Sequence, residues 1–117
     1  MKKKIFCFDI DNTLCVTKDK KYSKSKPIKE VVSLINNLYS EGHYIKIFTS
    51  RYMGRNNDNI KKAYKQGYQS TYKQLKSWGL KFHKLYMGKP SFDFFVDDRS
   101  IGFKRNWYKK FNHKINS

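Results

Sequence analysis

The chain has 117 residues, of which 38% are hydrophobic and 30% charged, a balance that suits one packed domain and excludes disorder of the bulk of the chain. Its 26 Lys and Arg residues outnumber its 9 Asp and Glu residues, and the net charge of +17 favours anionic partners. The two cysteines are too few for a disulfide framework, and the apolar patch near the N-terminus is too short for a signal peptide or a membrane span, so a cytoplasmic setting is expected.

The first part of the chain predicts a strand, a loop, a helix and a second strand. Ile5–Phe8 is a short apolar run typical of a fully buried strand, with Cys7 as one of its buried side chains. The Lys- and Ser-rich stretch 16–26 predicts an exposed loop. Pro27 suits the first position of a helix, because apolar residues recur at helical spacing after it. Residues 44–48 predict the second buried strand.

The second part predicts a divided helix, two short strands and a packed tail. Positions 60–78 keep an approximate helical period, but Gly67 predicts a break, with Ser70 capping a second helix. The apolar runs 85–87 and 92–96 predict two further strands. Aromatic residues recur in the tail and predict a packed segment or helix there.

This alternation predicts a single domain over residues 1–117 with an α/β, Rossmann-like fold, in which helices cover both faces of a mostly parallel sheet. Each predicted core strand runs into a polar cluster. In such sheets, ligands bind outside the carboxyl ends of the strands. We therefore expect the polar clusters to meet at one edge of the sheet, although they lie far apart in the sequence.

Four carboxylates are expected at this edge. Asp9 and Asp11 follow the first predicted strand, and Asp97 and Asp98 follow the last one. Carboxylates packed so closely repel one another, and the pKa of some of them rises sharply unless a cation lies among them. Ligands that offer only oxygen select a hard ion, for which Mg²⁺ is the natural choice. The four carboxylates are therefore predicted metal ligands.

A divalent ion beside a free carboxylate favours phosphoryl transfer. Asp9 can attack phosphorus as a nucleophile, and Asp11 can protonate the leaving alcohol and then activate water. Thr49 and Lys89 each follow a predicted strand and can hold the phosphoryl oxygens, which makes them the other two catalytic candidates. The predicted substrate-binding residues are Thr49, Ser50, Arg51, Lys89 and Arg99. For the two arginines, a surface ion pair is the alternative.

These clusters resemble the four motifs of the haloacid dehalogenase (HAD) superfamily, in the right order and over nearly the whole chain. The string DIDNTL, which begins at Asp9, resembles the first motif, and Thr49, Lys89 and the pair Asp97-Asp98 match the other three. The resemblance implies a Mg²⁺-dependent phosphomonoester hydrolase with Asp9 as nucleophile and Asp11 as acid and base. It also implies that the metal is held by Asp9, by the backbone carbonyl of Asp11, and by Asp97 or Asp98.

A closer resemblance is to small bacterial HAD phosphatases of capsule and surface-polysaccharide biosynthesis. It is carried by the strings FDIDNTLC, TSR, QLKSWGLKFHKLYMGKP and FFVDDRS. This resemblance implies a phosphorylated sugar or polyol as substrate. Neither gap between the motifs offers a separate cap domain, so the chain is expected to be capless. Capless members often form homo-oligomers or accept large substrates in an open site, and both outcomes stay open.

Two other functions also stay open at this point. A net charge of +17 and an open site would suit a phosphatase that acts on the 3′ ends of nucleic acids. The lysines are spread along the whole chain, however, which favours a small phosphorylated metabolite as the partner. The third alternative is an inactive module that binds phosphate or polyanions, and the complete set of acidic residues disfavours it.

Overall fold

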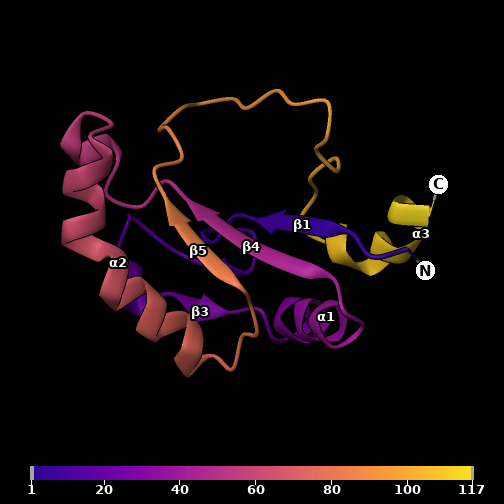
Figure 1. The fold of residues 1–117 in the computed structure, drawn as a ribbon. Coiled ribbons are helices and arrows are strands. Elements are labelled where there is room, and N and C mark those ends of the chain that lie inside the picture. The colour runs from indigo at the N-terminus through magenta and orange to yellow at the C-terminus, as the bar shows by residue number, and fades with distance from the viewer. Residues whose placement is uncertain (1, 117) are drawn as a thin grey trace.

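The central element of the protein is a three-stranded parallel sheet, seen in a computed structural model that describes residues 2–116. Its strands are β1 (Ile5–Phe8), β4 (Tyr44–Thr49) and β5 (Lys84–Met87), in the order β1-β4-β5 (Figure 1). Helix α1 (Lys29–Ser40) connects β1 to β4, and helix α2 (Ile60–Ser77) connects β4 to β5. The predicted α/β class with a parallel sheet is therefore confirmed.

Six short elements complete the fold: β2 (Cys15–Val16), η1 (Tyr22–Lys24), β3 (Lys26–Pro27), η2 (Gly54–Asn56), η3 (Trp107–Lys110) and α3 (Phe111–Asn116). Strands β2 and β3 pair antiparallel, so the stretch predicted as a plain loop contains a small ribbon. Pro27 does not begin a helix, because it pairs with Cys15 in this ribbon and α1 begins two residues later. Among residues 2–116, no helix has the length and apolar character needed to cross a membrane.

The hydrophobic core lies on one face of the sheet. The strand register places Phe8, Ile47 and Leu85 side by side, and all three belong to a buried cluster that also receives side chains from α1, α2 and the 107–111 segment. The opposite face presents Cys7, which is exposed, next to two lysines. The prediction of helices on both faces is wrong, as is that of a buried Cys7. The strand order runs in one direction, so two right-handed crossovers place both helices on the same side.

The apolar run 92–96 does not form the predicted strand. From 88 to 106 the chain runs as an irregular arch between β5 and the C-terminal helical segment (Figure 1). Phe94 and Val96 are 91% and 96% exposed. A strand needs a hydrogen-bonded partner as well as an apolar pattern, and in this structure the run has none. Strand β1 is consequently an edge of the sheet.

Helix α2 is continuous, so the predicted break at Gly67 is wrong. Its N-cap is Asn59, whose side chain accepts a hydrogen bond from the backbone N–H of Lys62. Ser70 does not cap a second helix, and its hydroxyl donates to the carbonyl of Gly67 instead. A β-carbon at Gly67 would lie 2.0 Å from the ring of Tyr52. The glycine therefore makes room for this ring against the helix.

We expect Gly67→Ala to lower the free energy of unfolding by about 1–3 kcal/mol, because the new methyl group collides with the Tyr52 ring. This loss exceeds the roughly 1 kcal/mol that alanine gains over glycine inside a helix. Urea unfolding measures the difference, with Gly102→Ala as the control, since nothing lies within 4 Å of a β-carbon at Gly102. A Gly67→Ala variant as stable as the parent would contradict the assignment.

Candidate functional site

Three of the predicted catalytic residues meet at the carboxyl edge of the sheet. Asp9 directly follows β1, Thr49 ends β4, and Lys89 lies two residues after β5. The backbone N–H of Lys89 donates to the carbonyl of Thr49 (3.1 Å), and Lys89 Nζ lies 3.6 Å from Asp9 Oδ2. The side chain of Thr49 is fully buried, and its hydroxyl accepts a hydrogen bond from the backbone N–H of Arg51. The parallel topology thus brings Asp9 and Lys89 into an ion pair.

Asp9 carries a partly buried carboxylate. Its side chain is 33% exposed, and Oδ1 accepts a hydrogen bond of 2.8 Å from the backbone N–H of Ile10. Burial raises the pKa of Asp9 above its ordinary value, while the charge of Lys89 and the Ile10 hydrogen bond act in the opposite direction. The carboxylate is therefore more basic than an exposed one, and Lys89 helps to keep it ionised.

The Asp9–Lys89 pair faces a cavity of about 520 Å³. Asp97 and Arg99 from the arch also line this cavity, and the Arg99 backbone N–H donates to Asp97 Oδ1 (2.8 Å). Lys89 Nζ lies 5.2 Å from the centre of the Phe95 ring, another wall of the cavity. Lys89 beside Asp9 can bind an anionic ligand, and Arg99 and Asp97 add one cation and one carboxylate to the same cavity. A second cavity of about 670 Å³, between α1 and the C-terminal segment, contains none of the predicted site residues.

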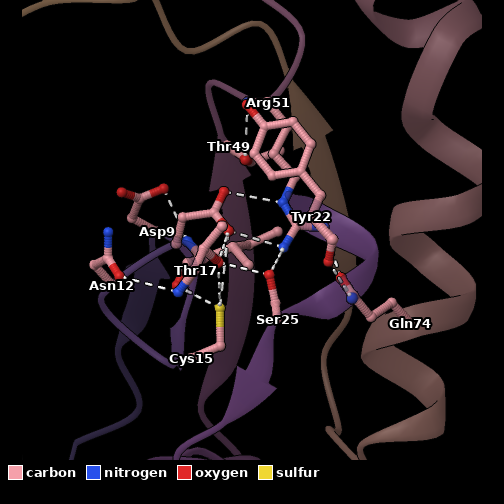
Figure 2. A network of polar contacts seen from close by, with 11 residues as sticks. Asp9, Asn12, Cys15, Thr17, Tyr22, Ser25, Thr49, Arg51 and Gln74 are labelled. Carbon is pink, nitrogen blue, oxygen red and sulfur yellow. Dashed lines mark hydrogen bonds and ion pairs between the residues drawn. The ribbon is translucent and has the colours of Figure 1, made fainter. Parts of the chain in front are cut away.

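Asp11 is held by Arg51 in a polar network, of which Figure 2 labels Arg51, Thr17 and Gln74. Arg51 Nε donates to Asp11 Oδ2 (2.9 Å) and Nη2 donates to Oδ1 (2.8 Å), which is the bidentate geometry of a strong ion pair. Arg51 Nη1 donates to Gln74 Oε1 (2.6 Å), and the Thr17 hydroxyl donates to Asp11 Oδ1 (2.5 Å). Figure 2 also shows Ser25, which accepts a longer contact from the same guanidinium.

This network assigns Arg51 to positioning Asp11. The arginine is 2% exposed, and each of its three guanidinium nitrogens donates to a side chain of the protein. Contact between Arg51 and a substrate stays a prediction, and it would require the network to open. Gln74 was not among the predicted site residues, although its position three residues after the buried Thr71 indicates the inward side of α2.

The predicted metal site is not assembled in this structure. Among residues 2–116, no three acidic, His or Cys side chains lie together in a group that could hold a metal ion. Asp97 shares the cavity with Asp9, whereas Asp98 is exposed and does not line it. Both oxygens of Asp11 accept from Arg51. The prediction assumed that 92–96 would pair as a strand, and without that pairing the donors present do not fit Mg²⁺.

Comparisons with known proteins support the fold. No protein-family model matches the chain, and no curated protein matches it. A crystal structure of a structural-genomics target from Vibrio cholerae is similar, with a TM-score of 0.78 and 21% sequence identity, and the match covers 95% of this chain and 98% of that chain. At this identity, the likeness shows that the two chains share a fold over nearly their whole lengths, and it shows the fold alone.

Proposed function

We propose that the protein is a phosphomonoester hydrolase of the HAD type, with Asp9 as its nucleophile. The observation that carries the proposal is the ion pair between Asp9 and Lys89, 3.6 Å apart at the carboxyl edge of a parallel sheet. The pair faces a cavity that Asp97 and Arg99 also line, and Lys89 is the cation that can hold a phosphate beside the Asp9 carboxylate. The order of the four sequence motifs supports the same assignment.

In the proposed reaction, an oxygen of Asp9 attacks phosphorus and the bond from phosphorus to the ester oxygen breaks. Asp11 enters this step protonated and out of its bidentate contact with Arg51, the alcohol leaves with the Asp11 proton, and the phosphoryl group remains on Asp9. A water molecule then gives a proton to Asp11 and attacks phosphorus, which releases inorganic phosphate and restores both side chains. Lys89 binds the phosphoryl oxygens, and Arg51 fixes the direction of the Asp11 carboxyl group.

A phosphorylated sugar or polyol is the proposed substrate, and a cytoplasmic enzyme of polysaccharide biosynthesis is the proposed setting. The substrate and the pathway follow from the resemblance to capsule-associated phosphatases, and the cytoplasmic location follows from the two cysteines and the short N-terminal apolar patch. The resemblance also implies Mg²⁺ as cofactor, although the donors described above do not fit it in this arrangement. Magnesium dependence is therefore measured directly, with added Mg²⁺ in one set of assays and EDTA in the other.

The test is phosphate release from a panel of sugar and polyol phosphates by the purified protein. We expect turnover by the parent chain and none by Lys89→Ala, because the variant loses the cation beside Asp9. Asp93→Ala is the matched control, since this exposed residue lies on the arch and outside the cavity. No release by the parent chain from any member, with or without Mg²⁺, would contradict the proposal.

One surface favours a second candidate function, hydrolysis of 3′-phosphates at nucleic-acid ends. Tyr64, Tyr68 and Tyr72 repeat every four residues along α2, and their ring centres lie 4.4 and 6.1 Å apart. Tyr64 is 52% exposed and Tyr72 is 38% exposed. The sequence of α2 contains five lysines and no acidic residue. Exposed aromatic rings beside lysines are typical of surfaces that bind single-stranded nucleic acids.

The two functions differ in salt dependence and in substrate preference. A nucleic-acid phosphatase should hydrolyse a 3′-phosphorylated oligonucleotide faster than a sugar phosphate, and its binding to that oligonucleotide should weaken steeply with salt. Replacing Tyr64 by Ala should weaken this binding, whereas the sugar phosphates should be unaffected. A sugar phosphate that is much the better substrate would exclude this second candidate.

A further inference from the structure

Two arginines lie against one tyrosine ring beside Asp11. The guanidinium carbons of Arg51 and Arg55 lie 4.7 and 5.7 Å from the centre of the Tyr22 ring. Burial and the charge of Asp11 raise the pKa of Tyr22, while both arginines lower it, so these charges all act on the same phenol. Arg51 is buried and bound to Asp11, as described above. Arg55 is exposed, and within residues 2–116 no carboxylate forms an ion pair with it.

Arg55 contacts two tyrosine rings that also pack against each other. Its guanidinium carbon lies 4.8 Å from the centre of the Tyr52 ring, and the Tyr22 and Tyr52 rings meet edge to face at 5.0 Å. Tyr52 has a φ of 67°, a left-handed conformation that is rare for a bulky residue, and its ring packs against Gly67 of α2. Tertiary packing must stabilise such a backbone, and strained residues of this kind cluster at functional sites.

A guanidinium that contacts aromatic rings can still bind an anion. The contact is made to the rings and not to a hydrogen-bond acceptor, so the N–H donors of the group stay available. Arg55 can therefore offer a fork of donors to a carboxylate or a phosphate, the two anions whose geometry that fork matches. Arg51 lacks this freedom, because its donors are already used inside the protein.

The loop that carries Arg55 is hydrogen-bonded to the loop that carries Lys89. The Ser91 backbone N–H donates to Asp58 Oδ1 (3.2 Å), and a β-carbon at Gly54 would lie 3.3 Å from Ser91 Oγ. Lys20 Nζ would lie 3.8 Å from that same β-carbon, so a second cation lies against the loop that carries Arg55. This loop is therefore a neighbour of the loop that carries Lys89.

We infer that Arg55 binds a second anionic group, located on the alcohol part of the substrate. The inference rests on the proposed function, in which Asp9 and Lys89 hold the phosphoryl group and Asp11 protonates the leaving alcohol. Arg55 contacts the same Tyr22 ring as Arg51, so it lies near the Arg51–Asp11 pair, and Asp11 is the proposed proton donor to that alcohol. The substrate class is then narrower: phosphomonoesters that carry a further carboxylate or phosphate, such as sugar-acid phosphates and sugar bisphosphates.

Matched substrates test this inference. Phosphogluconate and glucose bisphosphate carry a second anion, a carboxylate in one and a phosphate in the other, and glucose phosphate does not. We expect Arg55→Ala to raise KM for the doubly anionic substrates about tenfold, the loss typical of one charge-assisted hydrogen-bonded contact, and to leave KM for glucose phosphate unchanged. The KM of Arg55→Lys for the doubly anionic substrates should lie between the KM of the parent chain and that of Arg55→Ala. Arg105→Ala is the control, because it removes the same charge from another exposed position.

Three results would overturn the inference. One is an equal rise of KM for all substrates in Arg55→Ala. Another is the same rise of KM in Arg105→Ala, and the third is an effect of Arg55→Ala that is confined to a 3′-phosphorylated oligonucleotide.

Calorimetric binding of phosphogluconate and glucose phosphate to Asp9→Asn, with and without Arg55→Ala, is a second test, and it needs no turnover. If binding depends on Arg55 but the parent chain hydrolyses nothing, the anion site stands and the proposed function fails. If the parent chain turns over both substrates and Arg55→Ala does not distinguish them, the proposed function stands and the anion site fails.

Discussion

Asp9→Asn should reduce phosphate release by roughly 10³-fold or more on every substrate, because a neutral amide neither attacks phosphorus nor forms the aspartyl-phosphate. The ion pair with Lys89 and the hydrogen bond from Ile10 hold this carboxylate at the cavity, so no neighbouring group replaces it without rearrangement. Release is measured under saturating substrate, and trapping of phosphoprotein in the parent chain gives a second readout. Activity of Asp9→Asn within a few-fold of the parent would exclude Asp9 as the nucleophile.

The same substitution should stabilise the fold at neutral pH. Burial raises the pKa of Asp9, so the folded chain binds this proton more tightly than the unfolded chain does. Ionisation of Asp9 therefore destabilises the fold as pH rises through the interval between the unfolded and the raised folded pKa, and the loss persists above it. Asparagine carries no charge and avoids the loss.

Thermal unfolding as a function of pH checks whether Asp9→Asn stabilises the fold. Asp9→Asn should have a higher Tm than the parent at neutral pH, and the difference should vanish in acid below the unfolded pKa, where Asp9 is protonated in both states. Asp93→Asn, which removes an exposed carboxylate from the arch, is the control. A less stable Asp9→Asn variant at neutral pH would mean that the Lys89 ion pair outweighs the burial of the charge.

Arg51→Ala should destabilise the fold by roughly 1–4 kcal/mol, less than the loss for a fully buried ion pair because the Asp11 side chain is 23% exposed. Asp11 would lose its bidentate partner, and Gln74 would lose a hydrogen bond of 2.6 Å. Urea unfolding gives the difference. A double-mutant cycle with Asp11→Asn should show a coupling free energy of the order of 1–3 kcal/mol, and additive effects would contradict the pairing.

Arg51→Lys separates positioning from folding. Lysine keeps the charge but lacks the planar fork, so Asp11 should lose its fixed direction in a variant that still folds. The kcat for a sugar phosphate, whose alcohol must be protonated as it leaves, should fall by up to roughly 10²-fold. The kcat for p-nitrophenyl phosphate, whose leaving group needs no proton, should change little. An equal loss on both substrates would show that Arg51 does not act through Asp11.

The sequence alone determined which segments form the main helices and strands, and which polar residues follow the strands. The helical period of α1 appears as expected, and the strands predicted over 44–48 and 85–87 each gain one residue. The apolar run before Asp9 forms β1, although the predicted full burial of this strand is wrong. The meeting of Asp9 with Lys89 also followed from the pattern, because the carboxyl ends of parallel strands lie at one edge of a sheet. These features depend on local periodicity and on one general rule of topology.

Tertiary structure alone decided which groups pair and which faces are covered. Asp11 was expected near a metal and is instead held by Arg51, and Gly67 was expected to break a helix and instead receives the Tyr52 ring. The run 92–96 has a strand pattern but no strand beside it, so Asp98 stays away from Asp9 and its cavity. Each outcome depends on contacts between residues far apart in the chain. Local spacing carries no information about such contacts, because the same side chain can satisfy its charge or its apolar surface with several partners.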